Sequence, residues 1–274
     1  MTAMEGNRIR RAVKERRPLI HCITNPISIN SCANAVLALG ARPIMAEHPQ
    51  EVREITETAQ ALLLNLGNIT DVRIQSMQIS AEAAIEKEIP FVLDVVGIAC
   101  SRLRREFAHR LIEKSRPTVI KGNYSEIRAL YHSSYKSAGV DAEESLDKIA
   151  MANITGELAQ KYHTIILASG AEDIVTDGKR LVFVKNGTPQ LASITGTGCM
   201  LGALCSCYLS VCRDMAAVVT ACAVLGICGE LAGTAEGNGS FGINLMDRLS
   251  ILSDADLENR LKIEEMEETE IENI

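Results

Sequence analysis

Short apolar runs, each ended by a turn signal, alternate with segments of helical character along the first part of this chain. The clearest run is PFVLDVVG (90–97), which begins at Pro90 and ends at Gly97. Similar runs occupy residues 18–24, 43–45, 61–67, 118–123 and 164–170. The segments between them predict helices over 29–39, 49–59, 71–87, 102–115, 125–131 and 145–161. Strands that are apolar throughout and separated by helices are typical of an α/β fold: a central, mostly parallel sheet with helices on both faces.

The last third of the chain departs from this alternation. Asp177-Gly178 lies between two β-rich runs within residues 174–184, which predicts a hairpin. Two long apolar helices are expected near 198–212 and 215–232. A polar stretch over 132–144 is expected to form a loop.

Composition limits the size and the partners of the protein. The 274 residues contain no repeat and no low-complexity linker, so we expect a single domain over residues 1–274. The net charge is −7, from 28 basic and 35 acidic residues, and no basic run is present. Nucleic acids and anionic membranes attract clustered Lys and Arg, so neither is expected as a partner. Acidic residues gather at Glu264–Glu272, which we interpret as a solvated tail or a last helix.

Cysteine usage and the terminal segments favour a cytoplasmic protein. The nine cysteines are an odd number and lie mostly in apolar surroundings, unlike the disulfide framework of a secreted domain. Residues Met1–Arg17 lack the apolar core of a signal peptide. The apolar region 198–232 is interrupted by Arg213-Asp214, and each half is expected to be too short to span a bilayer.

In sheets of this kind, ligands bind outside the carboxyl ends of the strands. The residues that follow the predicted strands are therefore the first candidates for a site. They are Asn25, Met45, Asn65, Asp94, Asn123 and Ser169.

The segment ITGTGCM (194–200) is the most informative stretch for chemistry. Gly196 and Gly198 flank Thr197 directly before a long apolar helix. Backbone N–H groups at such a turn point toward an anion, and the helix dipole favours negative charge there. The segment therefore predicts a phosphate-binding turn, and an ordinary tight turn remains the alternative. No Lys follows, so this is not a Walker A loop.

Cys199 lies in the first turn of that predicted helix. A helix N-terminus lowers the pKa of a thiol, so one interpretation is a reactive thiolate. The alternative is one more buried cysteine, of which the sequence predicts several.

Hard oxygen ligands follow two neighbouring strands. Asp94 ends one of them, and Asn123 and Glu126 stand three residues apart after the next. Carboxylates suit Mg²⁺, which is usually shared with substrate phosphates. The alternative for Asn123 and Glu126 is a helix capping box. The five histidines show no metal-ligand spacing, although His21 is a candidate to line the site.

Together these stretches resemble the hydroxyethylthiazole kinases of the ribokinase-like superfamily. The resemblance runs in family order over nearly the whole chain. It rests on HCITNPISINSCANAVLALGARPIMA (21–46), LLLNLGNI (62–69), VLDVVG (92–97), IKGNYSEI (120–127), GVDA (139–142), ASGAEDIV (168–175), ITGTGCM (194–200) and GNGSF (237–241). It implies a kinase that uses ATP and Mg²⁺ to phosphorylate the primary alcohol of hydroxyethyl-methylthiazole, in thiamine biosynthesis or salvage.

The resemblance also implies roles for single residues. Superfamily kinases usually carry an Asp base after the Gly-rich turn, and hydroxyethylthiazole kinases typically have Cys there, as Cys199 is here. Cys199 is then expected to accept the alcohol proton or to orient the hydroxyl, while the N–H groups of Thr197, Gly198 and Cys199 stabilise the phosphoryl group. The remaining matched positions imply contacts with the thiazole through Met45, Gly196 and Asn25, with ATP through Lys121 and Ser169, and with Mg²⁺ through Asp94 and Glu126.

Three positions depart from the family pattern. Residues 94–99 read Asp-Val-Val-Gly-Ile-Ala where the family commonly has Asp-Pro-Val-Gly-Ala-Gly. Ser169 replaces the usual Thr but keeps the hydroxyl, and GNGSF replaces GPGSF. The loop after Asp94 is therefore the part of the site where this chain is expected to differ.

Three other functions remain open on the sequence alone. One is a related ribokinase-like kinase for pyridoxine, hydroxymethylpyrimidine or a sugar. Another is a thiol hydrolase with Cys199 as nucleophile, which would require a partner His. The third is a regulatory protein that binds nucleotide without turnover. The family resemblance further implies a homotrimer with sites between subunits.

Overall fold

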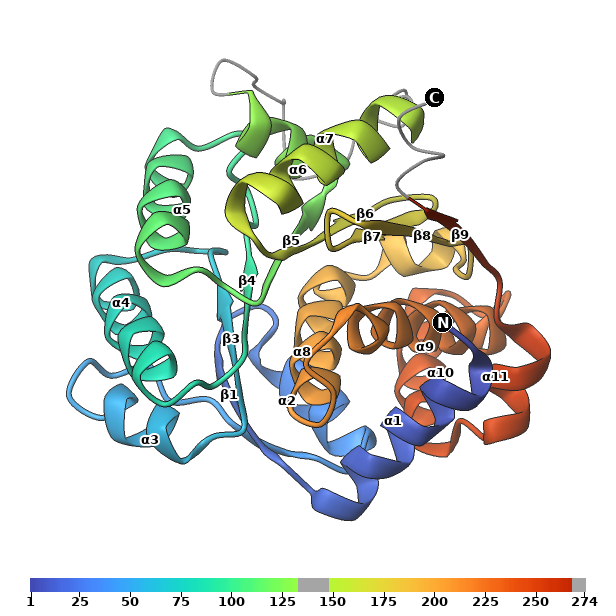
Figure 1. The fold of residues 1–274 in the computed structure, drawn as a ribbon. Helices are drawn as coiled ribbons and strands as arrows, with labels where there is room; N and C mark the ends of the chain where they lie inside the picture. Colours follow the sequence, from blue (N-terminus) through green and yellow to red (C-terminus); the bar gives the residue numbers. More distant parts are fainter. Residues whose placement is uncertain (133–147, 268–274) are drawn as a thin grey trace.

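The computed structural model describes residues 1–132 and 148–267, which contain a nine-stranded sheet in the order β2-β1-β3-β4-β5-β6-β7-β8-β9 (Figure 1). Strands β1 to β6 pair in parallel, and β7, β8 and β9 pair antiparallel at one edge. The strands are β1 (Leu19–Ile23), β2 (Arg42–Ile44), β3 (Ala61–Asn65), β4 (Phe91–Asp94), β5 (Val119–Asn123), β6 (Ile165–Ser169), β7 (Asp173–Thr176), β8 (Arg180–Val184) and β9 (Ile263–Glu267). The predicted mostly parallel α/β sheet is confirmed.

Helices cover both faces of this sheet. In Figure 1, α3, α4 and α5 lie on one side of the central strands, and α2, α8 and α9 lie on the other. The helices are α1 (Ala3–Arg16), α2 (Ile29–Ala38), α3 (Val52–Thr58), α4 (Asp71–Glu86), α5 (Arg102–Ser115), α6 (Tyr124–Tyr131), α7 (Lys148–Tyr162), the 3₁₀ helix η1 (Pro189–Ser193), α8 (Thr197–Leu209), α9 (Met215–Ala232), α10 (Asn238–Ile251) and α11 (Asp254–Arg260).

Each face of the sheet has its own hydrophobic core. Side chains alternate along a strand, so Leu63 of β3 joins the cluster with α2, α8 and α9, while Leu62 and Leu64 join the cluster with α4 and α5. A strand that is buried on both faces is apolar along most of its length. This is why these strands were readable from the sequence as continuous runs.

The hairpin is confirmed at the predicted place. β7 and β8 pair antiparallel, and Gly178 adopts φ +85° between them. Asp177 Oδ1 accepts hydrogen bonds from the N–H groups of Lys179 and Arg180, which closes the turn.

The chain ends differ from the sequence interpretation. The acidic stretch expected as a tail or helix contains β9, an edge strand whose Glu264 forms ion pairs with Lys185 and Lys148. The polar N-terminus forms α1, anchored by Ile9 and Val13 on its buried side. The segment GNGSF begins α10. The expected loop from residue 133 onward and the GVDA segment (139–142) lie outside the described residues.

Helix α9 corrects the length argument made for the apolar region. Its 18 residues are long and apolar enough to cross a membrane by length and composition, so the expectation was wrong for the second half of the region. It holds for the first half, where α8 has 13 residues. Burial identifies α9 as a core helix, because 83% of Met215–Ala232 is buried inside the fold.

Candidate active site

The strand register brings three polar side chains side by side at the carboxyl ends of β3, β4 and β5. Asn65 pairs with Asp94, and Asp94 pairs with Lys121, in the parallel ladder. Asn65 Nδ2 donates to Asp94 Oδ2 at 2.9 Å, and Lys121 Nζ donates to the same oxygen at 3.2 Å. The other carboxylate oxygen, Oδ1, is buried without a hydrogen-bond partner among the described residues. Such an atom normally has a ligand or ion beside it.

This cluster is an ion pair within the protein interior. Burial raises the pKa of Asp94, while the Lys121 ammonium and the Asn65 amide oppose that shift. Burial alone would lower the pKa of Lys121, but the charges of Asp94 and Glu126 raise it above its ordinary value. The lysine therefore stays charged in the buried pair.

Glu126 forms the capping box that the sequence left as an alternative. Asn123 Oδ1 accepts from the Glu126 N–H at 2.9 Å, and Glu126 Oε2 accepts from the Asn123 N–H at 2.8 Å. Its Oε1 accepts from the Gly97 N–H at 2.7 Å, which ties the loop after β4 to α6. Burial and then the charge of Asp94 raise the pKa of Glu126 to about 7, opposed by these backbone donors.

The Gly-rich turn begins α8 beside Lys121. Gly196 is the N-cap residue at φ +90°, a left-handed conformation that favours glycine. A Cβ on Gly198 would have only Lys121 Nζ within 4 Å, at 3.9 Å. The first N–H groups of a helix have no partner within it. Unpaired donors, an ammonium group and open space thus coincide at this turn, the combination that binds a phosphate.

The side-chain hydroxyl of Thr197 bonds within the protein, so its backbone N–H is the group that can face a ligand. Its Oγ1 donates to the carbonyl oxygens of Leu191, at 2.9 Å, and of Ile194, at 3.3 Å. These bonds hold η1 against the start of α8, so Thr197 fixes the shape of the turn.

Cys199 is buried, which disfavours the thiolate form. Burial and then the charge of Asp94 raise the pKa of its thiol, despite the helix N-terminus. Its Sγ accepts hydrogen bonds from Asn25 Nδ2 at 3.2 Å and Asn65 Nδ2 at 3.3 Å. His21 points elsewhere, so the thiol hydrolase interpretation lacks its base.

Asn25 links the end of β1 to this cluster. Its Nδ2 also donates to Asn65 Oδ1 at 3.1 Å, and its Oδ1 accepts from the Ser28 N–H at 3.2 Å. The chain beyond Asn25 thereby turns into α2, beside the N-cap of α8. A Cβ on Gly196 would lie 3.2 Å from Ser31 Oγ of α2, so the two helices approach each other closely here.

The other two predicted contact residues lie at the ends of outer parallel strands. Met45 follows β2 directly, is partly buried and packs against the core cluster of α2 and α8. Ser169 ends β6, opposite Asn123 of β5, and its Oγ donates to the Gly122 carbonyl at 3.4 Å. Ser169 and Lys121 therefore lie on adjacent strands.

Sequence patterns gave little or no indication that two residues at this edge of the sheet belong to the site. Asn65 stood only among the residues that follow strands, yet its amide bridges Cys199 and Asp94. Arg73 on α4 had no sequence signal at all, although its guanidinium is buried against the loop after β3.

His21 supports a loop instead of lining the site. It is fully buried, Nδ1 lies 2.9 Å from Thr56 Oγ1, and Nε2 donates to the Ala46 carbonyl at 2.9 Å. Burial lowers the pKa of His21 below its ordinary 6.5, despite the Ala46 carbonyl. The unfolded chain therefore binds this proton more readily than the folded chain.

This difference predicts a pH-dependent stability. The contribution of His21 is complete above pH 6.5 and is lost as the pH falls from there toward the folded-state pKa. Between about pH 7.5 and pH 5.5, His21→Gln should lose less unfolding free energy than the wild type, by at most about 1.4 kcal/mol per pH unit. Urea titrations at both pH values measure this. Equal losses in the two proteins would contradict it.

Comparison with known proteins shows which family this chain matches. The sequence profile of the hydroxyethylthiazole kinase family matches residues 11–255. Hydroxyethylthiazole kinase 2 of Clostridium botulinum is 44% identical, over 93% of this chain and 98% of the relative. A solved hydroxyethylthiazole kinase protein from Pyrococcus horikoshii gives a TM-score of 0.87 at 34% identity, covering 95% of this chain and 98% of that chain. A ribokinase-like superfamily protein from Enterococcus faecalis shares the fold, with a TM-score of 0.61 at 12% identity over 86% and 88% of the two chains.

Proposed function

This chain belongs to the hydroxyethylthiazole kinase family, and we propose that it transfers the terminal phosphoryl group of ATP to the primary hydroxyl of hydroxyethyl-methylthiazole, a step of thiamine biosynthesis or salvage. The observation that carries this proposal is the meeting of Asp94, Lys121 and the Gly-rich start of α8 at one edge of the sheet. Phosphoryl transfer depends mainly on positioning and charge neutralisation, which this arrangement supplies.

The chemistry assigns a role to each part of this edge. The alcohol oxygen forms a bond to the γ-phosphorus while the bond from that phosphorus to the β–γ bridging oxygen breaks, and ADP leaves with the electron pair. The N–H groups of Thr197, Gly198 and Cys199 donate to the phosphoryl oxygens. Lys121 neutralises charge on the phosphates, and Ser169 contributes its hydroxyl to the nucleotide from the adjacent strand.

Mg²⁺ fits the donors at the end of β4. The described residues hold no group of three or more His, Cys, Asp or Glu side chains that would form a complete metal site. Mg²⁺ needs only one or two carboxylates when phosphates and water complete its shell. Asp94 Oδ1, buried and unpartnered, supports direct ligation. Glu126 already accepts a backbone N–H on each oxygen, so it acts through water. Bound Mg²⁺ would neutralise charge that develops on the phosphates.

The alcohol is held on the side of the site near α2. Met45 and Gly196 contact the thiazole ring, and Asn25 lies beside the hydroxyl-bearing arm. Asn25 is well suited to this position because its amide is already fixed by Asn65 and Ser28. A fixed side chain loses little freedom when the substrate binds.

Cys199 orients the hydroxyl and is not its base in the resting enzyme. A thiol with a raised pKa is protonated at neutral pH, and a neutral thiol is too weak a base to accept the alcohol proton. That proton leaves late, to a phosphoryl oxygen, because a loose transition state needs little base assistance.

We therefore predict that Cys199→Ala lowers kcat by about tenfold, well below the 10²- to 10⁴-fold loss of a general base. Steady-state turnover with saturating thiazole and ATP measures this. Cys199→Ser is the matched control, because it keeps a group that can orient the hydroxyl. A thousandfold loss in the Ala variant would restore the base role, and full turnover would remove any role.

We infer a homotrimer with sites between subunits and a cytoplasmic location. Exposed apolar side chains on and beside α2 and α10 support this assembly, because a second copy would cover them; they are Ile27, Leu37, Ile243 and Ile251. Helices α2 and α10 pack together, so these side chains belong to one region. Sedimentation equilibrium tests the assembly, and the mass of a single chain would contradict it. All nine cysteines are free, as expected in a reducing compartment.

The substrate is tested by ADP release from Mg·ATP with several alcohols in parallel. Hydroxyethyl-methylthiazole is expected to give the highest kcat/KM, against pyridoxine, hydroxymethylpyrimidine and ribose. A higher kcat/KM with another alcohol would keep the kinase and discard the substrate. ATP binding without turnover on any alcohol would indicate a regulatory relative.

A further inference from the structure

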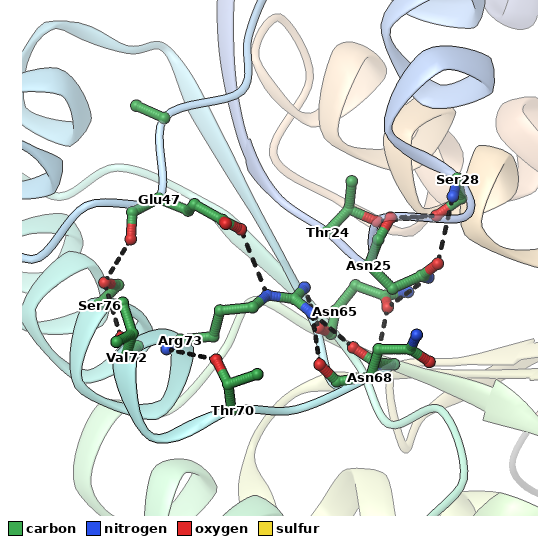
Figure 2. A network of polar contacts seen from close by, with 12 residues as sticks. Thr24, Asn25, Ser28, Glu47, Asn65, Asn68, Thr70, Val72, Arg73 and Ser76 are labelled. Atoms are coloured by element: carbon green, nitrogen blue, oxygen red, sulfur yellow. Dashed lines mark hydrogen bonds and ion pairs between the residues drawn. The ribbon is translucent and has the colours of Figure 1, made fainter.

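The segment that follows β2 contacts α4 through Glu47, which faces Arg73 and Ser76 of that helix (Figure 2). This segment, residues 45–48, begins with Met45. Its backbone is held by two side chains from different elements. His21 of β1 donates to the Ala46 carbonyl at 2.9 Å, and Ser76 Oγ of α4 donates to the Glu47 carbonyl at 2.7 Å. We call residues 45–48 the Met45 segment.

Arg73 of α4 binds the neighbouring loop after β3. Only 3% of this residue is exposed. Its Nη1 donates to the carbonyls of Gly67, at 2.7 Å, and Asn68, at 2.9 Å, and Nη2 donates to the Asn65 carbonyl at 3.5 Å. Asn68 has φ +45°, a left-handed conformation that is uncommon outside glycine and that these bonds help to hold.

The same guanidinium faces the Met45 segment. Arg73 Nε lies 3.5 Å from Glu47 Oε2, and Glu47 is about half exposed. Burial lowers the pKa of Arg73, and Glu47 opposes that shift. A buried guanidinium with three carbonyl partners needs a countercharge, and Glu47 supplies it. Arg73 thus joins the two loops that carry Met45 and Asn65.

We propose that Arg73 is a positioning residue for the alcohol site: through its ion pair with Glu47 and its bonds to the loop after β3, it fixes the Met45 segment relative to Asn65. This inference rests on the proposed function, in which Met45 is one of the residues that contact the thiazole. In the part of the chain that the structure describes, the ion pair of Glu47 is with Arg73, whereas Lys121 pairs with Asp94. The link therefore affects binding of the alcohol and leaves ATP binding and the chemical step unchanged.

The test uses Glu47→Gln, because Glu47 is the half-exposed partner of the pair. Thermal unfolding is measured in parallel, because the change leaves the buried Arg73 charge without its countercharge. We expect KM for the thiazole to rise about three- to fivefold, with kcat and KM for ATP within about twofold of the wild type. Glu47→Asp, which keeps the charge, should recover part of the difference. Backbone amides of residues 46–51 should exchange hydrogen faster in Glu47→Gln, while the last turn of α4 is unchanged.

The matched control is Glu86→Gln. Glu86 is the last residue of α4, at the opposite end from Arg73, and its Oε2 lies 2.8 Å from Nη1 of Arg53 in α3. The change removes this exposed ion pair. It should change neither KM nor exchange of the Met45 segment. Unchanged KM and unchanged exchange in Glu47→Gln would overturn the proposal, and so would an equal effect of Glu86→Gln. If the wild type phosphorylates no thiazole, the proposed function fails, and hydrogen exchange still tests the link.

Discussion

Asp94→Asn is expected to lower kcat by about a thousandfold, the size of loss seen when a preorganised electrostatic group is removed. The change keeps the shape of the side chain, so Asn65 can still donate to the remaining oxygen. It removes the negative charge that holds Lys121 and the unpartnered oxygen offered to Mg²⁺. The apparent Mg²⁺ concentration for half-maximal rate should rise along with the loss of kcat.

Turnover measured over a range of Mg²⁺ concentrations tests both effects. Because Asp94→Asn leaves the Lys121 charge buried without its partner, thermal unfolding is measured in parallel to separate lost activity from lost fold. A kcat within tenfold of the wild type, in a protein that unfolds normally, would show that Asp94 has no central role.

Gly198→Ala is expected to raise stability while it lowers activity. Gly198 is the second residue of α8, and replacing a helical glycine by alanine stabilises a helix by up to about 1 kcal/mol. The added Cβ would meet no atom except Lys121 Nζ at 3.9 Å, so the fold accommodates it. In the proposed function, the same methyl group would occupy the space through which a phosphate approaches the turn. We expect kcat/KM for ATP to fall about a hundredfold, as when reacting groups are misplaced by about 1 Å.

Gly156→Ala is the matched control for this experiment. Gly156 lies in the middle of α7, and a Cβ there has nothing within 4 Å. It should gain a similar stability with unchanged turnover. Full activity in Gly198→Ala would mean that the phosphates do not approach this turn, and the phosphate-binding interpretation would fail.

The sheet was predictable because its strands are buried on both faces. Runs such as ALLL (61–64) of β3 are apolar at every position up to the terminal Asn65, so periodicity was not needed to find them. Edge elements lack this signal. In β9, Ile263 packs against one core cluster and Met266 against the other, while the glutamates between them form ion pairs. A charged sequence of this kind also suits a solvated tail, and only pairing with β8 decides between them.

The site was predictable only in part. The rule that ligands bind beyond the carboxyl ends of strands led to Asp94, because a lone carboxylate ends an apolar run. The sequence does not contain the strand register, which sets Asn65, Asp94 and Lys121 side by side. The sequence also does not show how deeply Cys199 is buried, and this burial raises the pKa of its thiol. Arg73 resembles any surface arginine on a helix until the loops around it are placed.

The most direct test of the central claim is ³¹P NMR of the purified protein with Mg·ATP and hydroxyethyl-methylthiazole. We expect the ATP signals to be replaced by those of ADP and by one new phosphomonoester signal, in equal amounts and only when the alcohol is present. ADP with inorganic phosphate, or a phosphomonoester formed only from a different alcohol, would contradict the assignment of this site as a thiazole kinase.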